Sequence, residues 1–216
     1  RVIIFMALSN YEIMRNQMRR KFIKYDQIMM IQKYSLKNDS EYLYLDFVLR
    51  HYRINRKNGV VEWSDDCFKN CIEADYNESM TIYDILYYAK NTSDLSGNYC
   101  SLNMLKGTVT SSAPGSNMFQ SAADYFNGKV KELEAVCQLM GEKVDLSGDV
   151  AIKLYPFSFL PVIIQYWEAD NEFPANLKFM FDENILKYMH YETIFFMIGH
   201  LINRIQEIIK SCYGME

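Results

Sequence analysis

One short turn carries the residues that could do most chemistry, because an indole ring, several carboxylates and a proline follow one another there. It reads Trp167-Glu168-Ala169-Asp170-Asn171-Glu172-Phe173-Pro174, and Asp182-Glu183 comes after the next predicted strand. If the flanking strands pair as a hairpin, several carboxylate oxygens gather near one end of a sheet. Carboxylates are ligands that Ca²⁺ and Mg²⁺ prefer, and paired carboxyl groups can carry out acid–base steps.

We therefore predict a ligand site on this turn, in a cleft that also involves Tyr155. The predicted site residues are Trp167, Glu168, Asp170, Glu172, Phe173 and Asp182. A second interpretation stays open, because loops are polar by default and no ligand spacing here matches a known cation-binding loop. In this second interpretation, the turn is a solvent-exposed hairpin tip that binds no ligand. No catalytic residue and no metal ligand is assigned.

The cysteines show no recognisable metal motif. Cys67 and Cys71 have the spacing to share one helix face, but no second pair follows to complete a zinc site. The other three cysteines lack the spacing of an iron–sulfur cluster. Because free cysteine is among the most buried residue types, two buried thiols are the preferred interpretation of this pair.

The histidines are equally isolated. His51 lies on a predicted strand, and His190 and His200 lie on or between predicted helices, with no spacing typical of a metal triad. We predict that His200, which is surrounded by aliphatic residues, is a hydrogen-bonded core histidine. Ligation of a cofactor metal by His200 is the alternative.

Motifs for nucleophilic catalysis and phosphate binding are missing, so the sequence leaves open whether the protein is an enzyme. Residues 1–57 hold twelve Lys and Arg against five Asp and Glu, whereas residues 58–216 hold eleven against 22. The basic stretch Arg15 to Lys24 is the one feature that favours nucleic acid. A basic helix lying against the chain's own acidic surface is the preferred interpretation, so nucleic acid is not predicted as a partner.

Hydrophobic periodicity indicates the elements that position the turn. Ser9 and Glu12 form a capping box, and the apolar stripe that follows predicts one helix from about residue 10 to about residue 35. Residues 41–63 predict strands, with Asn58-Gly59 as a hairpin turn. A short helix over 82–89 and a loop-rich stretch over 96–117 follow.

The second half predicts a helix over 117–139 that ends at Gly141 as a C-cap. Three strands then form a meander over 150–155, 162–167 and 177–181, with Pro156 and Pro161 at strand ends. Helices over 183–189 and 191–211 close the chain. Strands and helices come in runs, which favours an α+β fold over a doubly wound one. We predict one domain over 1–216, in which an antiparallel sheet (an N-terminal hairpin and a C-terminal three-stranded meander) is packed by N-terminal, central and C-terminal helices.

Composition limits the class of protein. Half of the 216 residues are hydrophobic and 23% are charged, so the chain can bury a core and is not disordered. The 17 Tyr, 13 Phe and 2 Trp fall mostly at helix and strand spacing, which indicates core. Five scattered cysteines indicate a reducing compartment, and no apolar run, including residues 2–8, approaches the ~20 residues of a membrane span. A cytoplasmic protein is predicted.

The second half also carries a family resemblance. It rests on Gly148-Asp149, the strands around Pro156 and Pro161, the pattern Trp167-x-x-Asp170-x-Glu172-Phe173-Pro174-Ala175, and Phe181-Asp182. These residues resemble the family catalogued as domain of unknown function 3786, from anaerobic bacteria and archaea, over about 10–205. Asn171 stands where the family pattern is more often acidic, which weakens a cation site. Some relatives are joined to an iron–sulfur module similar to that of corrinoid iron–sulfur proteins, whose cysteine cluster this chain lacks.

Three functions fit these observations, and the cofactor is unknown in each. The main prediction is an accessory module that binds an unknown small molecule or protein partner. The resemblance implies a second function, a redox-linked or corrinoid-associated accessory protein of anaerobic one-carbon metabolism. The third is a metal-assisted enzyme that uses Asp170, Glu172 and Asp182.

Overall fold

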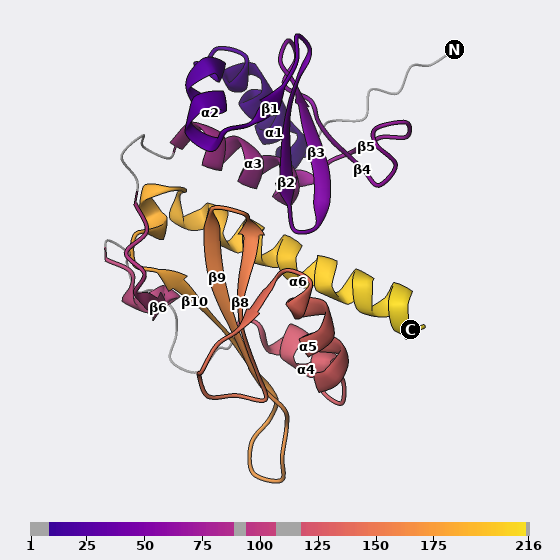
Figure 1. The fold of residues 1–216 in the computed structure, drawn as a ribbon, viewed down its shortest axis with the longest axis vertical. Helices are drawn as coiled ribbons and strands as arrows, with labels where there is room; N and C mark the ends of the chain where they lie inside the picture. Colours follow the sequence, from indigo (N-terminus) through magenta and orange to yellow (C-terminus); the bar gives the residue numbers. More distant parts are fainter. Residues whose placement is uncertain (1–8, 89–93, 107–117, 215–216) are drawn as a thin grey trace.

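The molecule consists of two lobes, each built on a five-stranded antiparallel sheet (Figure 1). The computed structural model describes residues 9–88, 94–106 and 118–214. Residues 9–88 form the N-terminal lobe and the described residues from 94 to 214 form the C-terminal lobe. The predicted α+β class with antiparallel sheet is confirmed.

The N-terminal lobe packs three helices against one face of its sheet. The strands follow one another in chain order, from β1 at one edge to β5 at the other. The helices are α1 (Asn10–Phe22), α2 (Gln27–Tyr34) and α3 (Tyr76–Tyr88). The strands are β1 (Lys37–Asn38), β2 (Tyr42–Phe47), β3 (Arg50–Asn55), β4 (Val61–Ser64) and β5 (Ile72–Glu73).

The prediction of a single first helix is wrong, because a new N-cap interrupts it. The capping box of Ser9 and Glu12 is present at the start of α1. After α1 ends, the Asp26 carboxylate accepts hydrogen bonds from the backbone N–H groups of Ile28 and Met29, at 3.0 and 3.1 Å. An aspartate at this position starts a helix, so the chain turns and α2 begins.

The hairpin at Asn58-Gly59 joins β3 to β4 as predicted. Gly59 has a φ of +73°, and an added Cβ there would lie 2.9 Å from the Arg19 carbonyl oxygen, so glycine is required. The hairpin between β2 and β3 has no such signal, because its tip is Val48-Leu49. Both residues have positive φ, at 47° and 58°.

The C-terminal lobe contains the predicted meander, with a short strand added at each edge. Its sheet order is β6-β10-β9-β8-β7. The strands are β6 (Tyr99–Ser101), β7 (Gly141–Lys143), β8 (Val150–Phe157), β9 (Leu160–Trp167) and β10 (Asn176–Asp182). The helices are α4 (Gln120–Phe126), α5 (Val130–Gln138) and α6 (Tyr191–Tyr213), with single 3₁₀ turns η1 (Leu102–Met104) and η2 (Ile185–Lys187).

Three predictions for this lobe are wrong. The helix expected over 183–189 is only the 3₁₀ turn Ile185–Lys187. The helix expected over 117–139 is two helices, separated at Asn127-Gly128, where Gly128 has a φ of +78°. Gly141 begins β7 rather than capping a helix, and its Cβ would overlap the Lys153 carbonyl. This glycine is needed for the close approach of β7 to β8. Part of the stretch predicted as loop, residues 107–117, lies outside the described residues.

Helix α6 crosses the middle of the molecule and packs on α3 of one lobe and on α5 of the other (Figure 1). Its apolar stripe is fully buried at Ile194, Met197, Ile198, Leu201, Ile205 and Ile209. One contiguous hydrophobic core therefore includes residues of both lobes. None of the described helices is long and apolar enough to cross a membrane.

Candidate functional site

The structure brings together part of the predicted acidic site. Trp167 ends β9 and pairs with Asn176 of β10, so the turn between them projects from one end of the sheet. Four of the six predicted residues, Trp167, Glu168, Asp170 and Phe173, line one open hollow of about 660 Å³. We call it the turn hollow, and its other lining residues are Gln120, Asp149, Pro174, Ala175 and Asn176.

The carboxylates of the turn already accept hydrogen bonds from the backbone. Asp170 accepts from the N–H groups of Glu172 and Phe173, at 2.8 and 2.7 Å, and these bonds hold its pKa below the usual range. Glu168 accepts from the Gly128 N–H at 2.8 Å, and the Glu168 N–H donates to Asp149 at 2.7 Å. These hydrogen bonds fix the backbone conformation of the loop, as the side-chain acceptors of Asx turns do.

The other two predicted residues do not join the turn hollow. Glu172 does not line it, and Asp182 lies at the opposite end of β10. Asp182 is completely buried and accepts hydrogen bonds from the backbone N–H groups of Ser96, Gly97 and Asn184, at 3.0, 2.8 and 2.8 Å. Its role is to hold residues 96–98 against the sheet. Tyr155 lies far from Trp167 along the meander, because Val150, not Tyr155, pairs with Tyr166.

No metal centre forms in the described part of the chain. Within it, no three or more His, Cys, Asp or Glu side chains are grouped so that they could hold a metal ion. Cys67 is exposed and Cys71 is partly exposed, so the prediction of two buried thiols is wrong. They lie in the loop between β4 and β5, where Cys67 and Phe68 have positive φ and no helix forms.

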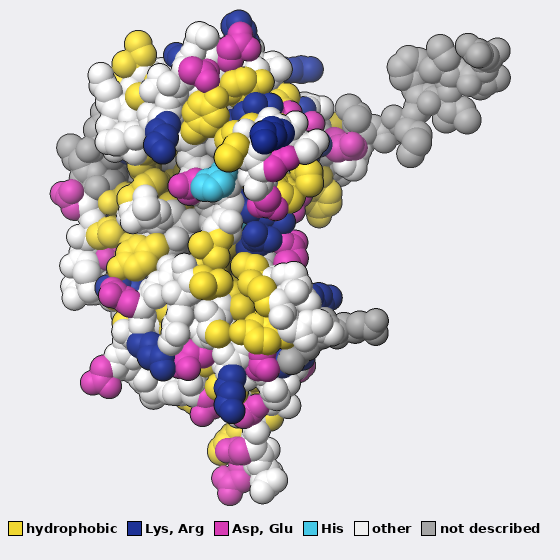
Figure 2. All heavy atoms as spheres, turned by 45° about the vertical axis from the view of Figure 1, so that its right-hand side comes forward, with side chains coloured by type: hydrophobic (Ala, Val, Ile, Leu, Met, Phe, Trp, Pro, Cys, Tyr) yellow, Lys and Arg dark blue, Asp and Glu magenta, His cyan; other side chains and the backbone are white. Residues whose placement is uncertain are grey.

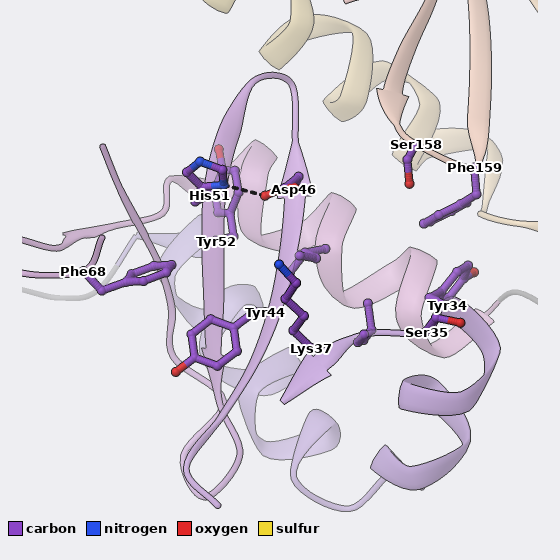
Figure 3. A pocket seen from close by; sticks show the side chains of 12 residues that line it. Tyr34, Ser35, Lys37, Tyr44, Asp46, His51, Tyr52, Phe68, Ser158 and Phe159 are labelled. Carbon is purple, nitrogen blue, oxygen red and sulfur yellow. Dashed lines mark hydrogen bonds and ion pairs between the residues drawn. The ribbon is translucent and has the colours of Figure 1, made fainter. Parts of the chain in front are cut away.

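A second hollow lies where the two lobes meet, and it has a volume of about 340 Å³. We call it the lobe pocket (Figure 3). It is lined by Tyr34, Ser35, Leu36, Lys37, Tyr44, Leu45, Asp46, His51, Tyr52, Phe68, Ser158 and Phe159. Ser158 and Phe159 come from the β8–β9 hairpin of the C-terminal lobe, and the other residues come from the N-terminal lobe. Figure 2 shows hydrophobic side chains gathered on one face at the level where the lobes meet.

Aromatic rings stand at two sides of the lobe pocket (Figure 3). Tyr34 of α2 stacks on Phe159, with ring centroids 4.3 Å apart and planes 27° apart. On the other side Tyr44 of β2 lies against Phe68, with centroids 5.6 Å apart. The Tyr34–Phe159 pair is a direct contact between the lobes. The pocket is therefore bounded by aromatic rings from both lobes.

Polar side chains line the same space. The His51 Nδ1 atom lies 2.6 Å from the Asp46 carboxylate, and both side chains are mostly exposed. Lys37 reaches between the two aromatic groups (Figure 3). Among the described residues, Lys37 has neither an ion-pair partner nor a side-chain hydrogen bond, and the same range offers no hydrogen-bond partner to the Ser35 and Ser158 hydroxyls. These three groups remain available to a ligand.

The β2–β3 hairpin tip holds the lobes together beside this pocket. Val48 is buried with a φ of 47°, which is unfavourable for a β-branched residue. Its backbone N–H donates to the Pro156 carbonyl of β8 at 2.9 Å. Strained backbone persists where the surroundings impose it, and it clusters at functional sites. A further hollow of about 390 Å³ lies beside the tip and shares Asp46, His51 and Ser158 with the lobe pocket.

A buried polar network lies behind the lobe pocket. The Tyr52 hydroxyl donates to Glu78 of α3 at 2.7 Å, and Arg50 donates to Glu78 and to Glu207 of α6, both at 2.9 Å. His200 Nε2 lies 3.2 Å from the Tyr52 oxygen, which confirms His200 as a hydrogen-bonded core residue. Burial raises the pKa of Tyr52 and lowers the pKa of His200 to about 4, so His200 is neutral near pH 7.

The basic helix α1 is partly neutralised by the chain itself. Arg15 and Arg19 both pair with Glu73 of β5, at 3.1 and 2.6 Å. Arg20, Lys21 and Lys24 have no ion-pair partner among the described residues. The helix therefore presents a smaller exposed positive charge than its sequence indicates.

Sequence reasoning missed the lobe pocket. Tyr44 and Asp46 alternate on the outward face of β2, and Asp46 pairs with His51 across the sheet. This pairing follows only when the turn is placed at Val48-Leu49, and neither residue is a turn former. The signal was therefore present in the alternation of β2, but its partner strand could not be aligned.

Comparison with known proteins identifies a family for this chain. The family model described as "Domain of unknown function (DUF3786)" matches residues 26–204, which include the lobe pocket and the turn hollow. No curated protein and no solved structure matches the chain. The matched residues make up most of the sequence. The chain therefore belongs to the DUF3786 family of domains of unknown function.

Proposed function

We propose that this protein is a binding module for a small molecule, and that the ligand occupies the lobe pocket. The observation that carries the proposal is the lining of that pocket. Residues of both lobes supply aromatic faces, and Lys37, Ser35 and Ser158 are polar groups that the described structure does not use. A volume of about 340 Å³ is in the range of small-molecule sites.

The turn hollow is the competing position for the same function. Its support is that Trp167, Glu168, Asp170 and Phe173 line one space, and that Lys178 lies over the Trp167 ring, 5.0 Å from its centroid. Its carboxylates, however, are engaged with backbone N–H groups. A ligand there would contact Trp167 and Phe173 more than the acids, so we place it second.

A fragment screen by NMR distinguishes the two positions. The full chain, labelled with ¹⁵N, is titrated with a library of small neutral, acidic and basic fragments, and amide shifts are mapped. We expect the shifts to gather at residues 34–37, 44–52 and 158–159. Shifts that gather at residues 167–176 instead would move the site to the turn hollow. A library that produces no localised shifts would contradict the proposal.

Two variants serve as matched controls for the screen. Tyr44→Ala removes an aromatic face of the lobe pocket, and Phe173→Ala removes one from the turn hollow, where it is 66% exposed. Neither side chain is fully buried, so both variants should fold. We expect Tyr44→Ala alone to abolish the shifts at the lobe pocket.

The redox-linked and corrinoid-associated alternative stays a prediction from the resemblance. Its test is the optical spectrum of protein purified without oxygen and then incubated with a corrinoid. Absorption bands that follow the protein through gel filtration would support it, and a featureless visible spectrum would count against it.

A further inference from the structure

We infer that the lobe pocket selects a flat ring that carries an acidic group. This inference rests on the proposed function and specifies its ligand class. Two features of the lining support this class: its aromatic rings and the ion pairing of its charged side chains.

The aromatic faces favour a flat ring over a saturated one. The Tyr34–Phe159 pair and the Tyr44–Phe68 pair stand on different sides of the space. Tyr34 and Phe159 are stacked on each other, with planes 27° apart, so a ligand meets an outer face or a ring edge of this pair. Flat rings gain offset-stacked and edge-to-face contacts with such aromatic rings, and these contacts require a π-system on both partners.

The charged side chains favour an acidic substituent. Lys37, Asp46 and His51 are the charged or titratable groups of the lining other than the tyrosines. Asp46 is engaged with His51 Nδ1 at 2.6 Å, whereas Lys37 has no ion pair in the described part of the chain. A carboxylate on the ligand can therefore pair with the Lys37 ammonium group and gain a charge-assisted hydrogen bond.

The His51–Asp46 pair adds a second polar contact. His51 Nδ1 lies 2.6 Å from the Asp46 carboxylate, so Nε2 is the ring nitrogen without a hydrogen-bond partner among the described residues. A ring hydroxyl on the ligand can form a hydrogen bond with that atom. The lining thus matches a ring with an acid at one position and a hydroxyl at another.

Three matched probes test this class. 4-Hydroxybenzoate is flat and acidic, 4-hydroxybenzamide is flat and neutral, and trans-4-hydroxycyclohexanecarboxylate is acidic and saturated. Each is titrated into the ¹⁵N-labelled full chain, and Kd is taken from the amide shifts of residues 34–37 and 44–52. We expect 4-hydroxybenzoate to bind at least about tenfold more tightly than either relative, which corresponds to 1.4 kcal/mol.

Lys37→Met sharpens the test, with Lys178→Met as the matched control. Both lysines are exposed on strands and lie near aromatic rings, but Lys178 stands over Trp167 beside the turn hollow. We expect Lys37→Met to weaken 4-hydroxybenzoate to the affinity of 4-hydroxybenzamide and to leave the amide unchanged. Lys178→Met should alter neither.

The outcomes separate this inference from the proposed function. If the saturated acid or the neutral amide binds the lobe pocket as tightly as 4-hydroxybenzoate, the ligand class is overturned while the pocket remains a binding site. The ligand class is also overturned if none of the three probes binds but other fragments of the library do. If no fragment shifts the lobe pocket at all, both the inference and the proposed function fail.

Discussion

The lobe pocket and the turn hollow differ in what their polar side chains already do. In the turn hollow, Asp149, Glu168 and Asp170 accept backbone hydrogen bonds and are part of the loop's own structure. In the lobe pocket, Lys37 has no partner among the described residues, and Asp46 holds a histidine rather than the backbone. A dense group of carboxylates in a sequence therefore does not by itself predict a ligand site, because the backbone can already occupy those carboxylates with hydrogen bonds.

The largest loss of stability is expected from a substitution in the buried polar network behind the lobe pocket. Arg50→Met leaves the buried Glu78 carboxylate without its cation, and loss of one partner of a buried pair costs about 3–5 kcal/mol of unfolding free energy. Urea unfolding followed by circular dichroism measures the loss. Arg53→Met, on the same strand and paired with the more exposed Glu62, should cost no more than about 1 kcal/mol. Equal losses would mean that the buried Arg50–Glu78 pair contributes no more to stability than the more exposed Arg53–Glu62 pair.

The pH dependence of stability tests the same network through His200. Burial lowers its folded pKa to about 4 from 6.5, so the unfolded chain binds the proton more tightly between these values. Stability is then complete above pH 6.5 and falls as the pH drops toward 4, by about 3 kcal/mol. Urea unfolding at several pH values should show a flatter profile for His200→Gln than for the native chain. Parallel profiles would contradict a neutral buried His200.

Asp182 and Asp170, two carboxylates of the predicted acidic site, are expected to contribute differently to stability. Asp182→Ala removes a buried acceptor from the N–H groups of Ser96, Gly97 and Asn184, and should lower the unfolding free energy by about 2–3 kcal/mol. Asp170→Ala affects an exposed turn and should cost less than about 1 kcal/mol. Thermal and urea unfolding provide the measurement. A large loss for Asp170 and none for Asp182 would reverse the roles assigned to them.

The smallest change in stability is expected at the tip of the β2–β3 hairpin. Leu49 has a φ of 58° and is 44% exposed, so Leu49→Asn relieves an unfavourable conformation and loses little packing. Stability should rise by about 1 kcal/mol. Leu139→Asn changes an exposed leucine with an ordinary φ of −67° and should not raise stability. A loss at Leu49 would show that its side chain is needed between the lobes.

Much of the fold could be predicted from local patterns. The apolar segments of β8, β9 and β10 and the Asn58-Gly59 turn were sufficient for the meander and one hairpin, because strand pairing there is between neighbours in sequence. The helix breaks at Asp26 and Gly128 were missed, since hydrophobic spacing continues across both. The Asp26 N-cap decided the first boundary and the positive φ of Gly128 the second, and such local features outweigh periodicity at helix ends.

The candidate site could be predicted less well. Tyr34 and Phe159 meet only because the two lobes pack together, and no local pattern encodes that contact. The acids around Trp167 were visible, but the backbone N–H groups that occupy them were not. Sequence shows which side chains can accept a hydrogen bond, whereas only the structure shows which of them already do.

The position of α6 has a consequence for how the chain is made. Helix α6 completes the packing around α3, which leaves the ribosome well before it. At about 5–20 residues per second, the intervening stretch takes several seconds to emerge. During that interval the apolar surface of the N-terminal lobe lacks its cover. The face of α3 that α6 covers therefore stays in contact with solvent on the nascent chain until α6 has been synthesised.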